Sequence, residues 1–213
     1  MKFKELGSGV VKRNSQRVIG LFIDGVGLDR ATRRIKKKVE MTKLIKGVSS
    51  GLTPIVARYY TLIPFEDDSR QRAYLDALVK AGLQVVAKRL PPRGVDRQVS
   101  ISAEMAADIV AFAMGYQNFS NLSLYTPDSA TSSSLVKAEE IAEVDKKPAE
   151  TLKQERIITL VCPNRDTSYA VSLAKEFNVD TITADFGKFN ASDMLKSAAK
   201  WIDLSDSETI WRE

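Results

Sequence analysis

Short apolar runs alternate with amphipathic stretches along most of the chain. The first run, from Val18 to Ile23, is apolar at nearly every position. Such a run is typical of a strand that is buried on both faces of a parallel sheet. Further runs rich in β-branched and aromatic residues predict strands at 54–62, 83–90, 157–161, 179–183 and 201–204, with a weaker candidate within 119–126.

Apolar residues at helical spacing predict a helix between most of these strands. The apolar face of the first helix consists of Leu28, Ala31, Ile35 and Val39. Other helices are expected from N-cap candidates at 67–69 to Gly82, at about 102–114, after a cap at Asp166 or Thr167, and at 193–199. Strands that alternate with helices through short connections predict an α/β fold with a mainly parallel sheet.

Polar segments outside these elements indicate how the chain is organised. A chain of 213 residues can bury one complete core, so a single domain is the default expectation. We expect a basic N-terminal arm at 1–16, the domain at 17–204 and a tail at 205–213. Residues 126–155 are rich in Ser, Thr, Lys and Glu, which predicts an inserted polar loop.

Composition limits the chemistry that the chain can perform. No apolar run approaches the length of a membrane span, and the N-terminal residues lack the apolar segment of a signal peptide. A single cysteine, Cys162, excludes an internal disulfide and fits a reducing compartment, so we expect a cytoplasmic protein. The chain has no histidine, which excludes His-based acid/base catalysis and argues against zinc. Any metal would therefore be a hard cation held by oxygen ligands.

The net charge of +5 permits a polyanionic partner. Basic side chains gather on the polar side of the first helix and just beyond it, at Arg30, Arg33, Arg34, Lys36, Lys37 and Lys38. Most such faces are simply solvated. The alternative is that these residues contact the phosphates of RNA.

Asp24 lies where the first strand ends. In open α/β sheets, ligands bind in the crevice outside the carboxyl ends of the strands, so this carboxylate is a candidate site residue. The alternative is that Asp24 only caps the helix that follows.

The residues from Phe22 to Leu28 resemble the opening Ile-Asp-Gly-x-Asn-Leu signature of NYN domains, which form the LabA-like branch of the PIN-like nucleases. The blocks at 58–60, 70–75 and 81–90 follow the order and spacing of that family, and 192–204 resembles its last helix and strand. The resemblance implies a PIN-like three-layer sandwich over 17–204, interrupted by the polar insertion.

The same resemblance implies metal-dependent RNA cleavage, in which aspartates at the edge of the sheet hold Mg²⁺ or Mn²⁺. A divalent ion neutralises charge on the phosphodiester and activates a water, and it needs several anionic oxygens to stay bound. The catalytic candidates implied are Asp24, Asp108 and Asp166. The implied metal ligands are the same three residues with Asn164.

Two of the expected acidic positions have lost their charge. Ser102 stands where the family has the Asp of its helical block, although Glu104 and Asp108 match. Asn164 stands for the first Asp of a Ser-Gly-Asp-x-Asp block placed at 162–166. A rival placement at 126–130 agrees better with the spacing from Asp108, whereas the order of the following elements favours 162–166, which we adopt.

Fewer carboxylates should weaken metal binding, leaving the metal loosely held or absent. Arg165 is expected to pair with Asp24 or Asp166 and to replace the ion. Each residue also has a purely structural alternative: Ser102 and Asp166 as helix caps, Asp108 as a surface residue, and Cys162 as a small apolar filler.

The sequence is therefore compatible with three functional hypotheses. The favoured one is a non-catalytic regulator or adaptor that binds RNA or a protein. The second is an active Mg²⁺- or Mn²⁺-dependent ribonuclease. The third is a structural subunit of a larger assembly, in which 126–155 would be a docking segment.

Overall fold

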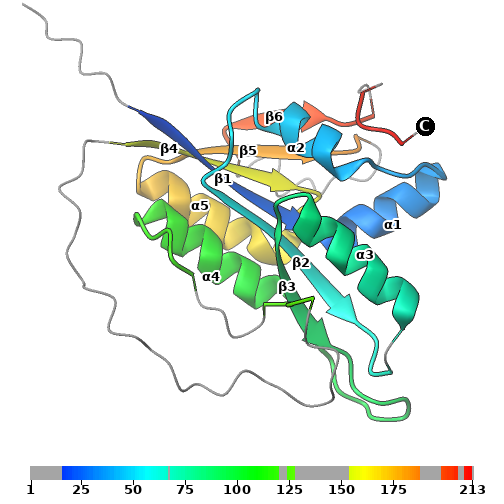
Figure 1. Ribbon diagram of the computed structural model, residues 1–213. Helices are drawn as coiled ribbons and strands as arrows, with labels where there is room; N and C mark the ends of the chain where they lie inside the picture. The colour runs from blue at the N-terminus through cyan, green and yellow to red at the C-terminus, as the bar shows by residue number, and fades with distance from the viewer. Residues whose placement is uncertain are drawn as a thin grey trace, which may run out of the picture.

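The computed structural model describes residues 16–66, 68–119, 124–127, 154–187, 198–205 and 209–212. In this part of the chain a six-stranded sheet has the order β3-β2-β1-β4-β5-β6, and every neighbouring pair is parallel (Figure 1). The strands are β1 (Arg17–Asp24), β2 (Val56–Ile63), β3 (Gln84–Arg89), β4 (Glu155–Val161), β5 (Asp180–Asp185) and β6 (Lys200–Asp203). The predicted α/β fold with a mainly parallel sheet is confirmed.

Helices cover both faces of the sheet, which makes a three-layer sandwich (Figure 1). One apolar core joins the sheet to α1 (Gly25–Ile35), α2 (Met41–Val48) and α3 (Ser69–Lys80). The other core joins it to α4 (Ser102–Ala113) and α5 (Ser168–Glu176). A short 3-10 turn, η1 (Arg165–Thr167), precedes α5.

Strand β1 is central to both cores. Every residue of β1 after Arg17 is buried, with Phe22 in the core under α4 and α5 and Ile23 in the core under α1 to α3. This two-sided burial explains why the run is apolar without alternation. A side chain at Gly20 would come within 2.9 Å of the Phe112 ring, so α4 packs closely on this strand.

The sheet changes its direction of growth at β1. From β1 the chain builds outward through β2 to β3, and it then returns to place β4 on the other side of β1. Connections on the two sides of the β1–β4 pair run to opposite faces of the sheet. A crevice at the carboxyl ends of these two strands follows from that topology.

Helix α3 begins and ends as its sequence predicts. The Asp68 carboxylate accepts a hydrogen bond from the backbone N–H of Arg70. Gly82 has a φ of 89°, the left-handed conformation that closes many helices after their last turn.

Helix α1 is shorter than predicted. It ends at Ile35, because Lys36 adopts a left-handed conformation with a φ of 59°. Val39 is not on the helix but forms an antiparallel bridge with Trp211. The carboxylate of Glu40 then caps α2, which the sequence analysis did not predict, by accepting from the backbone N–H groups of Thr42 and Lys43.

Residues 209–212 belong to the domain and do not form the expected tail. Ile210 is 1% exposed, and the Trp211 ring stacks on Phe186 at a centroid distance of 5.6 Å. Two apolar residues in a polar segment have no periodicity, which is why the sequence pattern missed this packing.

Several predicted segments lie wholly or mostly outside the described residues. The arm at 1–15, most of the 126–155 insertion and most of the 193–199 helix lie outside the described residues. Within 119–126, the described residues contain an isolated antiparallel bridge from Leu124 to Val86 and no strand.

Candidate functional site

Asp24 is the last residue of β1 and the N-cap of α1. Its Oδ1 atom accepts a hydrogen bond from the backbone N–H of Gly27 at 2.9 Å, as the capping alternative predicted. The side chain is buried at the carboxyl edge of the sheet. Burial raises the pKa of Asp24, although the N–H groups of Gly27 and Val26, the charge of Arg30 and the amide of Asn164 act in the opposite direction.

Gly27 allows the first turn of α1 to lie against the end of β4. A Cβ atom at this position would be 2.3 Å from the carbonyl oxygen of Cys162. The Asn found here in the NYN signature therefore has no room in this backbone, and glycine fits the close approach.

Asn164 links Asp24 to the start of α4. Its Nδ2 donates to Asp24 Oδ2 at 3.2 Å and to Ser102 Oγ at 2.7 Å. Its Oδ1 accepts from the backbone N–H of Asp166 at 2.9 Å, which makes Asn164 the cap of η1. Because a backbone N–H only donates, this contact fixes the amide with its NH₂ group toward Asp24. The N-cap position of α5 is Thr167, one of the two predicted, although its side chain makes no cap hydrogen bond.

Ser102 does not act as the predicted helix cap. The N-cap position of α4 is Ile101, which makes no side-chain cap, and the buried Ser102 directs its hydroxyl at Asn164. Three elements, β1, α4 and the β4–η1 connection, thus bring Asp24, Ser102 and Asn164 into one hydrogen-bonded cluster. We call these three residues the Asp24 cluster. The rival placement at 126–130 lies mostly outside the described residues.

Asp108 has a different environment. Its Oδ2 lies 2.5 Å from Arg58 Nη1 and 2.7 Å from the Tyr60 hydroxyl. The Arg58 side chain is 3% exposed, donates from Nε to Gln84 and lies over the Phe119 ring. Asp108 is thus committed to neutralising a buried guanidinium and is not the surface residue of the structural alternative. Sequence analysis missed Arg58 because a charged residue within a strand gives no sign of its partner.

Asp166 is exposed in η1 and contributes its backbone N–H to Asn164. Among the described residues, no contact joins Asp166 or Asp108 to Asp24. The three catalytic candidates therefore make no direct side-chain contact with one another in the described part of the chain.

Asp185 is a carboxylate that the sequence analysis overlooked. It ends β5, is 5% exposed and accepts from Trp201 Nε1 at 2.8 Å. Burial raises its pKa against the opposing effect of the Trp201 bond, and the nearby charge of Asp203 adds to the rise. The signal was present, since Asp185 follows a predicted strand as Asp24 does.

Cys162 lies close to both carboxylates. Burial raises the pKa of its thiol well above the usual range, and the charges of Asp185 and Asp24 raise it further. The thiol is therefore protonated at neutral pH, which agrees with the interpretation of Cys162 as an apolar filler.

A cavity of about 280 Å³ opens beside the Asp24 cluster. It lies at the carboxyl edge of β1, β4 and β5, where the topology places a crevice. Its lining combines arginines, polar groups and apolar side chains: Gly27, Arg30, Ala31, Arg34, Cys162, Pro163, Asn164, Arg165, Asp185 and Phe186. We call it the arginine cavity.

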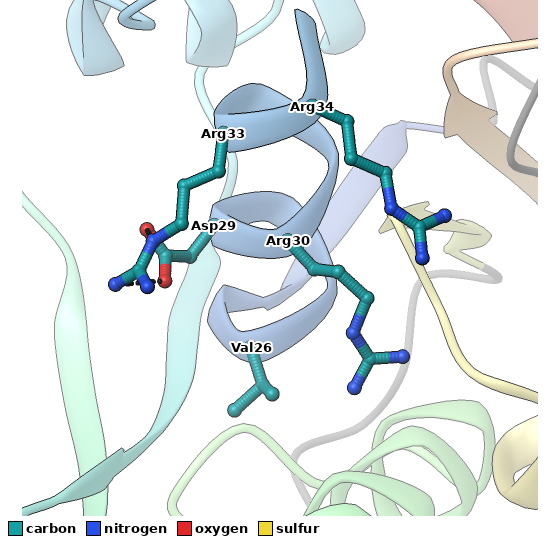
Figure 2. A pocket seen from close by; sticks show the side chains of 5 residues that line it. All are labelled: Val26, Asp29, Arg30, Arg33 and Arg34. Atoms are coloured by element: carbon teal, nitrogen blue, oxygen red, sulfur yellow. Dashed lines mark hydrogen bonds and ion pairs between the residues drawn. The ribbon is translucent and has the colours of Figure 1, made fainter. Parts of the chain in front are cut away.

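The basic stretch does not form one continuous face. Arg30 and Arg34 line the arginine cavity, whereas Arg33 is paired with Asp29 at 2.9 Å. Figure 2 shows the Arg33–Asp29 pair on one side of α1 and Arg30 and Arg34 on the other. The lysines lie beyond the end of the helix, and Lys37 Nζ is 5.0 Å from the centre of the Trp211 ring. Of the expected face of Arg30, Arg33, Arg34, Lys36, Lys37 and Lys38, the three arginines line one pocket on α1 together with Val26 and Asp29, and the lysines lie apart from it.

Arg165 does not have the predicted partner. The contacts of the described residues include no ion pair from Arg165 to Asp24 or Asp166, and the positive charge that acts on Asp24 is that of Arg30. Arg165 instead lines the arginine cavity opposite α1.

The Asp24 cluster does not fit a divalent ion in this arrangement. Both oxygens of Asp24 accept hydrogen bonds from the protein, and Asn164 offers its NH₂ group where a ligand oxygen is needed. No group of three or more acidic, Cys or His side chains that could hold a metal occurs among the described residues.

No protein-family model matches this chain, and no curated protein matches it. A crystal structure of a protein of unknown function from Vibrio parahaemolyticus RIMD 2210633 is similar, with a TM-score of 0.64 and 11% identity. The match covers 93% of this chain and 98% of that chain, and at this identity it concerns the fold alone. In the part of the chain that is described, no helix has the length and apolar character needed to span a membrane.

Proposed function

We propose that this chain is an NYN-type, PIN-like protein that binds RNA without cutting it and acts as a regulator or adaptor. The observation that carries the proposal is the amide of Asn164, which donates to Asp24 at the position where a nuclease of this type needs another carboxylate. A neutral donor there removes negative charge and satisfies the oxygen that an ion would take.

The arginine cavity supports binding to a polyanion. Arg30, Arg34 and Arg165 are among the residues that line one cavity beside the Asp24 cluster. Planar guanidinium groups form paired hydrogen bonds with phosphate oxygens, and binding that uses them weakens as salt rises.

The test is a binding and cleavage assay with labelled single-stranded RNA. We expect retention of RNA that weakens as the salt concentration rises. No cleavage is expected in Mn²⁺ or Mg²⁺. Absence of RNA retention would overturn the proposal, and capture of a defined protein in that case would favour the structural-subunit role.

A second candidate is a metal-dependent ribonuclease. It is favoured by the two buried carboxylates, Asp24 and Asp185, which both act on Cys162. Cleavage that requires Mn²⁺ and stops in Asp24→Asn would establish it. Calorimetric titration with Mn²⁺ separates the two candidates directly, because the non-catalytic protein is expected to bind no ion at millimolar concentrations.

A further inference from the structure

The arginine cavity has two basic walls. Arg30 and Arg34 stand one turn apart on α1 and supply one wall, and Arg165 of η1 supplies the other. Figure 2 shows Arg30 and Arg34 on the same side of the helix, away from the Arg33–Asp29 pair. Positively charged residues of two separate elements therefore border a single, partly open cavity.

The size of the cavity limits what can enter it. A volume of about 280 Å³ is at the lower end of the range for small-molecule sites, roughly 300–1,000 Å³. One nucleotide is of this scale, and several consecutive nucleotides are not. The cavity therefore suits the end of a strand better than its middle.

Charge also favours a terminal phosphate over an internal one. A phosphodiester carries one negative charge, whereas a phosphomonoester carries about −1.5 to −2 at neutral pH and has three strong acceptor oxygens. Three guanidinium groups around one volume match the second group better, because each additional oxygen can accept another charge-assisted hydrogen bond.

The remaining lining suits the nucleoside that accompanies such a phosphate. Phe186 and Pro163 provide apolar surface, and Asp185 provides a carboxylate whose Oδ1 accepts from Trp201. A carboxylate can accept more than one hydrogen bond, so Asp185 can also accept one from a ribose hydroxyl.

We infer that the arginine cavity binds a nucleotide phosphomonoester, with Arg30, Arg34 and Arg165 on the phosphate and Asp185 on the sugar. The inference rests on the proposed function, in that the nucleotide is the phosphorylated end of an RNA strand. The same chemistry is present in a free nucleoside monophosphate, so the experiment includes both.

The experiment measures fluorescence anisotropy of one RNA sequence in three forms: 5′-phosphorylated, 3′-phosphorylated and with hydroxyls at both ends. We expect one phosphorylated form to bind about tenfold more tightly than the hydroxyl form, as one or two charge-assisted bonds provide. Uridine monophosphate and adenosine monophosphate, added as competitors, test the free nucleotide.

Arg34→Gln and Arg165→Gln should each abolish the preference for the phosphorylated end. Arg33→Gln is the matched control, because it removes the same charge from the same helix but from a residue that does not line the arginine cavity. It should leave the preference within about twofold of the native value. All three arginines are exposed, so folding should be unaffected, and thermal unfolding checks this.

Each outcome decides between the proposals. Equal affinity for the three RNA forms would overturn the inference and leave the proposed RNA-binding function intact. If no RNA form binds, calorimetric titration with the two nucleoside monophosphates replaces the competition, and their binding would support the cavity's ligand chemistry and overturn the proposed function. Equal losses in Arg33→Gln and Arg34→Gln would show general charge attraction and would also overturn the inference.

Discussion

Asp24 and Asp108 are the same residue type, and the family resemblance assigns both to one site, yet they have opposite partners. Asp108 faces the buried guanidinium of Arg58, so its negative charge is neutralised inside the protein. Asp24 faces neutral donors, the amide of Asn164 and the N–H of Gly27. The charge of Asp108 is thus offset by a paired cation, whereas both oxygens of Asp24 are satisfied by neutral donors and burial raises its pKa.

Of the changes that test this contrast, removing the Asp108 carboxylate should have the largest effect on the free energy of unfolding. Asp108→Ala removes the carboxylate that pairs with the buried Arg58 guanidinium, and breaking one side of such a pair costs about 3–5 kcal/mol. Urea denaturation measures the loss. Asp166→Ala is the control, since Asp166 is exposed and its change should stay within about 0.5 kcal/mol. A loss below about 1 kcal/mol in Asp108→Ala would show that Arg58 does not depend on this partner.

The next largest effect on stability should come from the close packing of Gly27 against the Cys162 carbonyl. Gly27→Ala introduces a Cβ atom 2.3 Å from the Cys162 carbonyl, which forces the backbone to move and should destabilise by about 1–3 kcal/mol. Gly47→Ala is a matched substitution within α2, where the nearest atom is 3.8 Å away. It should stabilise by up to about 1 kcal/mol through helix propensity. Equal unfolding midpoints for the two variants would contradict this packing.

Restoring charge to the Asp24 cluster should convert it to a metal site. The double variant Ser102→Asp, Asn164→Asp replaces the two neutral groups beside Asp24 with carboxylates, and we expect Mn²⁺ to bind with a dissociation constant on the order of 1 mM or tighter. Mn²⁺ should then raise its melting temperature and leave that of the native chain unchanged. The control is the same variant with Asp24→Asn, in which binding should weaken at least tenfold. Strong Mn²⁺ binding by the native chain would remove the distinction between the two aspartates.

The smallest effect is the pH dependence contributed by Asp185. Because its folded pKa is raised above the ordinary value of 3.8, the folded state binds the proton more tightly than the unfolded state. Stability from this group is complete below pH 3.8 and is lost as pH rises through the folded pKa. Asp185→Asn keeps an acceptor for Trp201 and removes the charge, so its advantage over the native chain should grow from pH 3.5 to pH 7 in urea titrations. A constant difference across that range would show that the Asp185 charge is not responsible.

Local patterns predicted the fold well because they report burial and capping directly. The unbroken apolar run of β1 reflects its two covered faces, and Asp68 and Gly82 mark the ends of α3 by their own backbone chemistry. Helix α2 was missed because it has only eight residues, and Val39 matched a helical spacing by coincidence.

The candidate site was predicted in part. Asp24 was found from its place at a strand end, and the positions of Ser102 and Asn164 were found from the resemblance. The pairing of Asp108 with Arg58 spans 50 residues and depends on which sides of β2 and α4 face each other, which no local pattern contains. Asp185 was not predicted, although its place at the end of β5 matches that of Asp24 at the end of β1.

The sheet order has a consequence for how the chain is made. β1 pairs with β4 in a register that sets Arg17 against Glu155, a separation of 138 residues. Until β4 has been synthesised, β1 is an unpaired edge strand of a sheet that contains only β1, β2 and β3. Unpaired apolar edge strands pair with other chains and lead to aggregation. Nascent chains and truncated fragments that stop before β4 should therefore depend on chaperones. The second half of the sequence, by pairing β4 with β1, protects the first half from aggregation.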